Sequence, residues 1–506
     1  MRPNFKISIS YPPLGSSKGT PLLSQNRQFQ WFNDPTYIYP MVPAFAASLL
    51  KKSGYEVFWD DGIAEGLTYQ QWLDRLSQEA PDLIALETKT PVVKRHWRII
   101  DEVKTCLPNA KVVLMGDHVS AFPLESFESS RVDVVIASGD YDFALKGLAD
   151  FFSSRKRRCD DGGVYFRSPD KGYDFSNIKA ISMKNNDTVF YSGAVDLNRH
   201  DLNALPPIDR DLTRWGLYAY KNGNFKYLPG TYTMAGRDCW WGKCVFCSWA
   251  ALYPGHTYRT FPVERQLDEI GSLIDRYRVR EIFDDSGCFP RGSWLKEFCK
   301  GVIDRGYHKK VVLGCNMRVG ALDQEQFRLM KKANFRFILI GLESMNQVTL
   351  DRLKKGIKVD QIEETCRMAK KAGLEPHITA MAGYPWETRE DAEQTINFAK
   401  RLFSKGYIDS LQATIVVPYP GTPMFDEALA NGWLTTMDWD NYDMKESVWR
   451  SPVSSKDVKC LTQGLYKAAL NPIFIGRKIL SVRSVDDLKF YLRAARKIFA
   501  HITDFS

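Results

Sequence analysis

The sequence lacks any long hydrophobic run. No window approaches the roughly 20 consecutive apolar residues that an α-helix needs to cross a bilayer, and no apolar stretch follows Met1. The signature of a secretory signal peptide is therefore missing at the amino-terminal end. We expect a cytoplasmic protein that does not span a membrane.

Dense positive charge and the dinucleotide fingerprint are also missing. The net charge of +9 is spread over 506 residues, and the one dense basic run, Arg155–Arg158, is short. Binding along nucleic-acid phosphates needs a wider basic surface, so we interpret this run as a solvated loop and expect no nucleic-acid partner. The Gly-x-Gly-x-x-Gly spacing does not occur in the amino-terminal segment, which argues against a dinucleotide ligand there.

What is present is the composition of a folded, multidomain protein. The chain is 44% hydrophobic and 25% charged, which is close to the average for globular proteins, and its length predicts two or three domains. Among the 10 cysteines, three lie within nine positions, at Cys239, Cys244 and Cys247. This crowding favours a metal site in a reducing compartment over a disulfide framework.

Residues 1–150 alternate between strand and helix patterns. The expected strands are 6–10, 55–59, 81–86, 110–115 and 132–136. This alternation predicts a doubly wound parallel sheet, which binds ligands beyond the carboxyl ends of its strands. The turns after Ser10, Leu86, Met115 and Ile136 are the candidate ligand rim.

The rest of the chain divides into three parts. Residues 151–225 are irregular and are expected to form a linker, with some strand content, that wraps between domains. Residues 226–425 carry a second series of strands and helices. The strands expected in it are 227–234, 281–283, 310–314, 335–340, 377–381 and 411–417. Six such units predict a partial (β/α)6 barrel with its active site at the carboxyl ends of the strands.

The last part, residues 426–506, has helical patterns. Ser484 is a candidate cap for a helix that carries one apolar face. The apolar positions of this face are Leu488, Leu492, Ala495, Phe499 and Ile502. We expect the helix to pack on its own protein, although a basic amphipathic helix can also rest on a membrane surface.

The cysteine loop reads Cys239-Trp-Trp-Gly-Lys-Cys244-Val-Phe-Cys247. Three thiolates can hold three irons of a 4Fe–4S cluster and leave the fourth iron open to an external ligand. A structural zinc site is the alternative, but it takes four closed ligands, and the only nearby imidazole is His256. Plain buried cysteines are a third interpretation.

This loop, the polar strand ends and the number of βα units resemble those of radical S-adenosylmethionine (SAM) enzymes. In that family SAM chelates the open iron through its amino and carboxylate groups, and an electron from the cluster cleaves it to a 5′-deoxyadenosyl radical. The usual spacing has three residues between the first two cysteines, whereas four separate Cys239 from Cys244. We expect the extra residue to leave a four-iron cluster, which a Mössbauer spectrum would test.

The resemblance also implies residues that contact SAM. Phe246 would flank the adenine, and Asp284, Asp285 and Ser286 would meet the amine. The contacts expected from later strand ends are Arg318, Glu343, Gly383 and Pro418. Each has a structural alternative: the two aspartates could begin a helix, Arg318 and Glu343 could pair with each other, and Gly383 could serve only a turn. Cys288 and Cys315 lie within possible reach of substrate, and no catalytic residue is assigned.

The amino-terminal sheet is similar to the cobalamin-binding domain of the cobalamin-dependent radical SAM class. The matching segments are Tyr11-Pro-Pro, Gly54-Tyr-Glu-Val, Pro81-Asp-Leu-Ile, Gly116-Asp-His-Val-Ser and Ser138-Gly-Asp. This likeness implies cobalamin contacts by Tyr11, Gly116, Asp117, His118, Ser138 and Gly139. Other cobalamin domains carry Asp-x-His-x-x-Gly, but Asp117 and His118 are adjacent here, so a histidine ligand to cobalt is not expected. An empty sheet with a structural role is the alternative.

Taken together, the resemblance implies methylation of an unactivated carbon or phosphorus centre through the radical and methylcobalamin. The electron donor would be a flavodoxin or ferredoxin, and the substrate a small or lipid-like molecule. An alternative is radical cyclisation, rearrangement or carbon–carbon coupling without cobalamin, with a lipid-like molecule as one candidate substrate. The aromatic segment Phe29–Tyr39 and the basic terminal helix motivate it. A third possibility is a non-catalytic binding protein with a structural zinc.

Overall fold

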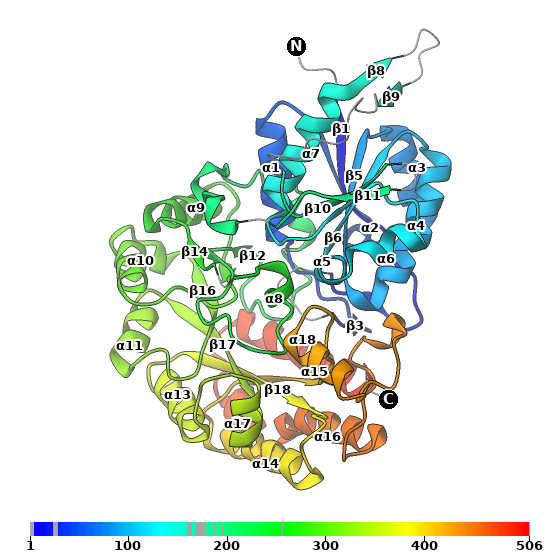
Figure 1. Ribbon diagram of the computed structural model, residues 1–506. Helices are drawn as coiled ribbons and strands as arrows, with labels where there is room; N and C mark the ends of the chain where they lie inside the picture. The colour runs from blue at the N-terminus through cyan, green and yellow to red at the C-terminus, as the bar shows by residue number, and fades with distance from the viewer. Residues whose placement is uncertain are drawn as a thin grey trace.

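The protein consists of two parallel sheets, one above the other, with a helical carboxyl-terminal region beside the lower sheet (Figure 1). The computed structural model describes residues 5–23, 29–158, 164–166, 178–185, 188–194, 196–255 and 257–504. The predicted order of folds, with a doubly wound sheet, a partial barrel and then helices, is confirmed.

The upper sheet has seven strands in the order β11-β10-β7-β6-β5-β1-β4. Its parallel members are β1 (Lys6–Tyr11), β4 (Glu56–Asp61), β5 (Leu83–Thr88), β6 (Lys111–Gly116) and β7 (Val134–Ile136). They coincide with the five strands expected from the sequence. Strand order reverses around β1, which pairs with both β4 and β5, and a reversal of this kind marks the usual ligand position in open sheets.

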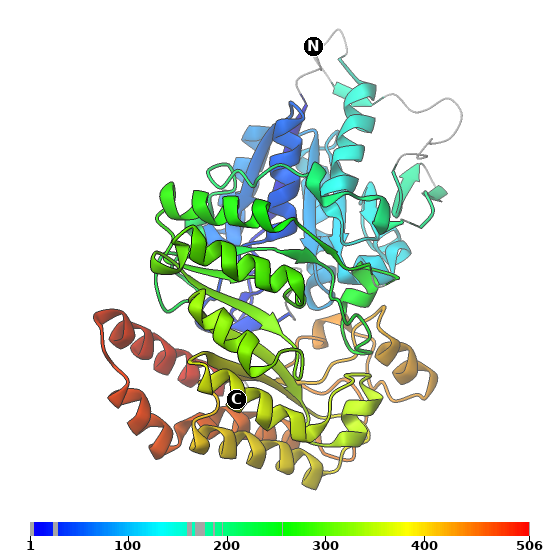
Figure 2. The ribbon, with the colours of Figure 1, turned by 90° about the vertical axis from the view of Figure 1, so that its left-hand side faces the viewer.

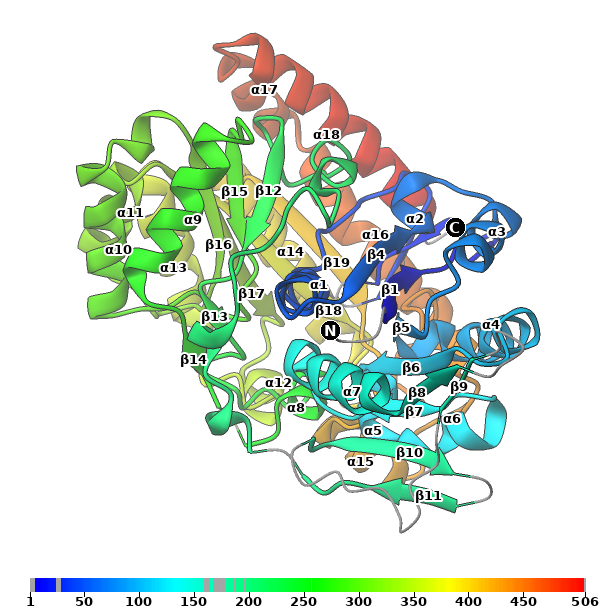
Figure 3. The ribbon, with the colours of Figure 1, turned by 90° about the horizontal axis from the view of Figure 1, so that it is seen from above.

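Helices cover both faces of this sheet (Figure 3). The principal ones are α1 (Met41–Lys52), α3 (Tyr69–Glu79), α4 (Val93–Cys106) and α7 (Tyr141–Arg155). All six residues of β5 are buried, as expected for a strand that is covered on both sides. Thr68 begins α3 with a reciprocal capping box to Gln71, which satisfies two N–H groups that the helix itself leaves unpaired.

Part of the segment between the sheets extends the upper sheet. Strands β10 (Ile181–Asn185) and β11 (Thr188–Tyr191) form a hairpin, and β10 pairs antiparallel with β7. The β10–β11 hairpin therefore covers the edge strand β7, which would otherwise end the parallel part of the sheet. A short hairpin, β8 (Lys156–Arg158) and β9 (Val164–Phe166), precedes it.

The lower sheet is a six-stranded parallel half-barrel in sequential order. Its strands are β12 (Gly230–Thr233), β15 (Glu281–Asp284), β16 (Val312–Met317), β17 (Phe335–Glu343), β18 (Glu375–Ala382) and β19 (Ser410–Ile415). The helices along its outer side are α9 (Val263–Asp275), α10 (Ser293–Asp304), α11 (Gln324–Lys332), α13 (Val359–Lys371) and α14 (Arg389–Lys405) (Figure 1). The carboxyl ends of these strands lie next to the cysteine loop.

Three helices end the chain: α16 (Ser455–Lys467), α17 (Pro472–Leu480) and α18 (Val485–Asp504). Tyr466 of α16 donates a hydrogen bond to the Ala413 carbonyl of β19, so α16 is fixed to the last barrel strand. Helices α17 and α18 form one edge of the molecule (Figure 2). The predicted apolar positions Phe499 and Ile502 lie in α18, but their side chains are outside the described residues. No helix in the described part of the chain has the length and hydropathy to cross a membrane.

Candidate active site

The cysteine loop links β13 (Gly236–Arg237) to the short helix α8 (Trp249–Leu252). Asp238 and Gly242 both have left-handed backbone conformations, with φ of +72° and +60°, which turn the chain sharply. Near the end of the loop, the Cys247 N–H donates to the Cys244 carbonyl at 3.2 Å. The loop is thus a compact turn that is held by a backbone hydrogen bond within it.

The extra residue in the loop has a structural explanation. The Trp240 indole donates to the Phe289 carbonyl at 3.1 Å, and the Trp241 indole donates to the Lys354 carbonyl at 2.9 Å. The Arg318 guanidinium lies 3.7 Å from the Trp241 ring centroid and 5.6 Å from that of Trp240. The longer spacing therefore accommodates two indoles that anchor the loop to two different segments near the strand ends.

The three loop thiols open onto one cavity but differ in their electrostatics. The Cys288 thiol donates a hydrogen bond that lowers the pKa of Cys239 to about 6, with further help from the backbone N–H groups of Gly242 and Trp241. Burial raises the pKa of Cys247 to about 12. A thiolate is the form that binds iron, so Cys239 is the ligand best prepared for a cluster.

The loop fits a 4Fe–4S cluster. Cys239, Cys244 and Cys247 all line the same cavity. Within the described residues, no three His, Cys, Asp or Glu side chains gather closely enough to hold a single metal ion. A 4Fe–4S cluster does not require such a gathering, because each cysteine binds a different iron.

The cavity has a volume of about 890 Å³ and runs through the barrel. Near the loop it is lined by Phe246, Arg318, Glu343 and Lys355, and further along by Leu339, His377 and Thr379. Its far end lies among Arg336, Glu375 and Asp409 and the side chains of α17 and α18. Phe32 and Ile38 of the amino-terminal domain complete the wall, so the cavity involves both domains.

Of the eight residues expected to contact SAM, three line the cavity and five do not. Phe246, Arg318 and Glu343 line the cavity, whereas the other five do not. These five are Asp284, Asp285, Ser286, Gly383 and Pro418.

The Asp284 carboxylate accepts hydrogen bonds from the Ala235 and Ser286 N–H groups, and burial raises its pKa to about 7. Gly383 has φ of +95° and its carbonyl accepts from the Trp449 indole, as a turn glycine does. Of the two further cysteines, Cys288 lines the cavity and Cys315 does not.

Lys355 is a site residue that sequence reasoning missed. Its ammonium group lies 2.5 Å from the Glu343 carboxylate, and both side chains are buried. Burial opposes the charge of Lys355, but Glu343 outweighs it and raises the lysine pKa. The partner of Glu343 is therefore Lys355 rather than Arg318. Glu343 has φ of +64° at a register shift between β17 and β18, and this strained backbone is a frequent mark of functional sites.

The residues expected to contact cobalamin lie at the carboxyl ends of the upper strands but do not line the cavity. The Tyr11 hydroxyl donates to Glu87 at 2.6 Å, and Asp117 pairs with Lys89 at 3.1 Å. His118 is fully buried, and its Nε2 lies 3.0 Å from Glu125. The His118 imidazole is therefore engaged by Glu125 within the protein.

Ser138 and Gly139, the last of these expected contacts, lie at the interface between the two domains. The Gly139 N–H donates to the Leu252 carbonyl of α8 at 2.7 Å, and a Cβ at Gly139 would lie 2.5 Å from the Tyr253 ring. Only glycine allows the sheet rim to approach the chain after the cysteine loop this closely.

The interface also contains a buried ion-pair network. Arg237, two residues before Cys239, pairs with Asp140 at 3.0 Å and with Asp142 at 2.7 Å, and none of these three side chains is exposed. Arg259 also pairs with Asp140 at 2.8 Å. The rim of the upper sheet is thus joined to the beginning of the cysteine loop.

Glu87 makes stability depend on pH near neutrality. Burial raises its pKa from 4.5 to about 7, so the folded state holds a proton that the unfolded state has lost. This contribution, on the order of 3 kcal/mol, is present below the unfolded pKa and is lost as pH rises through about 7. The melting temperature of the apoprotein is expected to fall between about pH 5 and pH 8. Burial of Asp61 and Asp284 acts in the same direction.

Glu87→Gln should flatten this fall, as measured by calorimetry across the pH range. The matched control is Glu56→Gln, because Glu56 is exposed at the start of β4. If the Glu87→Gln and Glu56→Gln proteins show the same pH dependence, Glu87 does not carry the effect.

Comparisons with known proteins agree with this site. Residues 235–399 match the Radical SAM superfamily. The chain is 28% identical over 419 residues to an uncharacterized methyltransferase of Pyrococcus horikoshii, covering 81% of this chain and 83% of the relative. It is 24% identical to the anaerobic magnesium-protoporphyrin IX monomethyl ester cyclase of Cereibacter sphaeroides, covering 84% of this chain and 64% of the cyclase.

Solved structures share the whole fold. The cobalamin-dependent SAM radical enzyme OxsB matches with a TM-score of 0.70 and 14% identity, covering 99% of this chain and 72% of OxsB. The radical SAM methyltransferase TsrM of Kitasatospora setae matches with a TM-score of 0.62 and 16% identity, covering 85% of this chain and 76% of TsrM. Residues 235–399 form a radical SAM domain. The chain has the two-domain architecture of OxsB and TsrM, and the class predicted from its sequence is confirmed.

Proposed function

We propose that this enzyme methylates an unactivated carbon or phosphorus centre with the help of a 4Fe–4S cluster, SAM and cobalamin. The observation that carries the proposal is the interface: the rim of the upper sheet, where doubly wound folds bind ligands, is joined to the cysteine loop by buried ion pairs. The methyltransferase relatives support it, as does the architecture shared with OxsB and TsrM. We propose residues 1–150 as the cobalamin-binding unit and 226–425 as the radical unit.

When bound, the cluster and SAM would supply a radical that abstracts hydrogen, and cobalamin would supply the methyl group. Cys239, Cys244 and Cys247 would hold the cluster, and the nearby charge of Lys355 would favour their thiolate forms. Phe246 offers a flat apolar face for the adenine, with Lys355 5.7 Å from its ring centroid. The Glu343–Lys355 pair offers both an acceptor and a donor to the polar end of SAM.

The fit of cobalamin to the amino-terminal rim depends on small and polar groups. Glu87 Oε1 is buried and has no hydrogen-bond partner, so it can accept from an amide of a bound ligand. Because His118 is engaged by Glu125, we propose that cobalamin binds without a histidine ligand from this position. An absorption spectrum of the loaded protein would reveal histidine ligation and contradict this assignment.

An assay of the reconstituted enzyme with SAM, methylcobalamin and candidate substrates tests the function. We expect a methylated product to form together with 5′-deoxyadenosine, and we expect product formation to stop when cobalamin is omitted. Release of 5′-deoxyadenosine without methyl transfer, across substrates that are consumed, would contradict methylation.

The second candidate is radical cyclisation, rearrangement or coupling without cobalamin. The similarity to the cyclase of Cereibacter sphaeroides favours it. Corrin affinity separates the two candidates, because a protein that neither carries nor binds cobalamin would support the second.

The cavity also bears on substrate and partners. We propose a lipid-like substrate, because leucine, isoleucine and phenylalanine side chains of α17 and α18 form the outer part of the cavity wall. A flavodoxin or ferredoxin would supply the electron, and α18 would contact a membrane surface.

A further inference from the structure

Helices α17 and α18 carry an unusual share of the exposed apolar surface. Of the 14 exposed large hydrophobic side chains in the described part of the chain, eight lie between residues 470 and 492. They are Leu470, Ile473, Ile475, Ile479, Leu480, Val485, Leu488 and Leu492. Leu480 is 76% exposed and Val485 is 67% exposed. A contiguous exposed group of this kind marks an interaction surface.

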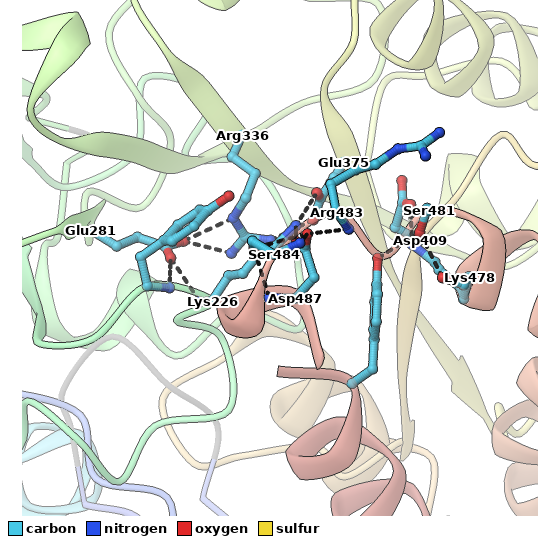
Figure 4. Close-up of polar contacts among 12 residues, drawn as sticks. Lys226, Glu281, Arg336, Glu375, Asp409, Lys478, Ser481, Arg483, Ser484 and Asp487 are labelled. Carbon is cyan, nitrogen blue, oxygen red and sulfur yellow. Dashed lines mark hydrogen bonds and ion pairs between the residues drawn. The ribbon is translucent and has the colours of Figure 1, made fainter. Parts of the chain in front are cut away.

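Two charged residues of these helices, one on each helix, pair with the barrel (Figure 4). Asp487 of α18 pairs with Lys226, and Lys478 of α17 pairs with Asp409. The Ser484 hydroxyl accepts from the Asp487 N–H and caps α18, as the sequence predicts. Around them, Arg336 bridges Glu281 and Glu375 at the base of the barrel. These ion pairs fix both helices to the barrel, whereas the apolar side chains named above remain exposed.

The outer face is also basic. Residues 467–497 contain eight Lys or Arg residues and two Asp residues, a net charge of +6 out of +9 for the whole chain. Both aspartates, Asp486 and Asp487, pair with basic residues outside this segment, Arg280 and Lys226. Three of the basic residues, Lys478, Arg496 and Lys497, pair with Asp409 and Asp34 outside it. Lys467, Arg483, Lys489 and Arg496 are exposed. Apolar side chains flanked by exposed basic ones are the pattern of helices that lie on anionic membranes.

The exposed face continues into the cavity. Leu470, Ile475, Ile479, Leu488 and Leu492 are exposed and also line the cavity. The outer opening of the cavity is therefore surrounded by the same side chains that form the apolar face.

We propose that α17 and α18 lie on an anionic bilayer and that the cavity receives its apolar substrate from that bilayer. The first half extends the membrane contact of α18 proposed above to α17 and to an anionic surface, and the second half rests on the proposed function. A second copy of the chain fits the face less well, because a two-fold contact would bring two sets of exposed basic side chains together. Phosphatidylserine head groups would neutralise that charge.

The test uses the full-length, anaerobically reconstituted enzyme and co-sedimentation with vesicles. We expect binding to vesicles of phosphatidylcholine with about 30% phosphatidylserine, and weaker binding to phosphatidylcholine alone or at high salt. Leu480→Glu/Val485→Glu should reduce the bound fraction about tenfold or more. Neither Leu480 nor Val485 lines the cavity, so this variant alters the face without altering the cavity.

The matched control is Leu429→Glu/Val348→Glu, which makes the same two substitutions at positions that are 55% and 64% exposed elsewhere. It should bind like the unaltered enzyme. A milder variant, Leu480→Ser/Val485→Ser, should also lose binding and serves if the glutamate variant folds poorly. Hydrogen exchange on vesicles should slow in residues 470–497 and not in α12 (Gln347–Arg352).

Three results would overturn the proposal. The first is no binding of the unaltered enzyme to anionic vesicles. The second is equal binding by the variant and its control. The third is a dimer in sedimentation velocity that Leu480→Glu/Val485→Glu dissociates, which would show that a second copy covers the face. Vesicle binding requires no methyl transfer, so failure of the methylation assay leaves this test intact.

Discussion

Replacing Cys244 by alanine is expected to abolish SAM cleavage and to remove the cluster. Cys244 is one of the three loop thiols that open onto the cavity beside Arg318 and Lys355, and an iron that loses its thiolate has no substitute ligand within the loop. Iron should fall from roughly four per chain to below about one. Cleavage of SAM should fall more than about 100-fold, the upper end of what losing a partner behind a metal ligand costs.

The control is Cys460→Ala, because Cys460 is an exposed cysteine on α16. Iron and sulphide analysis, Mössbauer spectroscopy and 5′-deoxyadenosine release would be measured on both variants. A Cys244→Ala protein that keeps a four-iron cluster and its activity would show that the ligand set lies elsewhere. In the unaltered enzyme the Mössbauer spectrum should show a four-iron cluster despite the longer loop.

Replacing Arg237 by methionine is expected to lower the free energy of unfolding more than any other substitution proposed for this protein. The change leaves Asp140 and Asp142 in a site with no solvent exposure. Removal of one partner from a buried ion pair costs about 3–5 kcal/mol, which should lower the melting temperature by roughly 5 °C or more. Burial disfavours the charge of Asp140, but Arg237, His200 and Arg259 outweigh it and hold its pKa well below the ordinary value. After the substitution, only His200 and Arg259 remain to stabilise the buried charge of Asp140.

Arg276→Met is the matched control, because Arg276 forms an exposed pair with Asp211. Such a pair contributes at most about 1 kcal/mol. Calorimetry at pH 7 compares the two variants. If Arg237→Met melts no lower than Arg276→Met, the buried network does not hold the domains together.

Local patterns made the fold predictable. Alternating strand and helix periods located both parallel sheets, because strands covered on two sides need continuous apolar runs such as residues 83–86. The cysteine loop was also predictable from a local pattern, because its three cysteines lie within nine consecutive residues. Ser484 as a helix cap is also a local signal.

Contacts between distant residues could not be predicted. Asp142 and Arg237 are 95 positions apart, and Trp241 is 113 positions from its acceptor Lys354. No periodicity connects such pairs, so Lys355 and the two indoles were missed. The Asp284 carboxylate is another example: it accepts from the Ala235 N–H, which only the folded chain brings near.

The outward face of α17 shows another limit of sequence patterns. An amphipathic period states which residues share a side of a helix but not whether that side meets protein or solvent. The ion pairs of Asp487 and Lys478 determine which side of each helix meets the barrel, and their partners lie far away in the sequence.

The contact of Gly139 with Leu252 and Tyr253 limits how this enzyme could have exchanged parts with others during evolution. The Tyr253 ring requires a glycine opposite it, since a Cβ at Gly139 would lie 2.5 Å from the ring. An ancestor that acquired a new amino-terminal domain would have needed a glycine at this position of that domain. The two domains are therefore expected to have been inherited together, as one unit of descent.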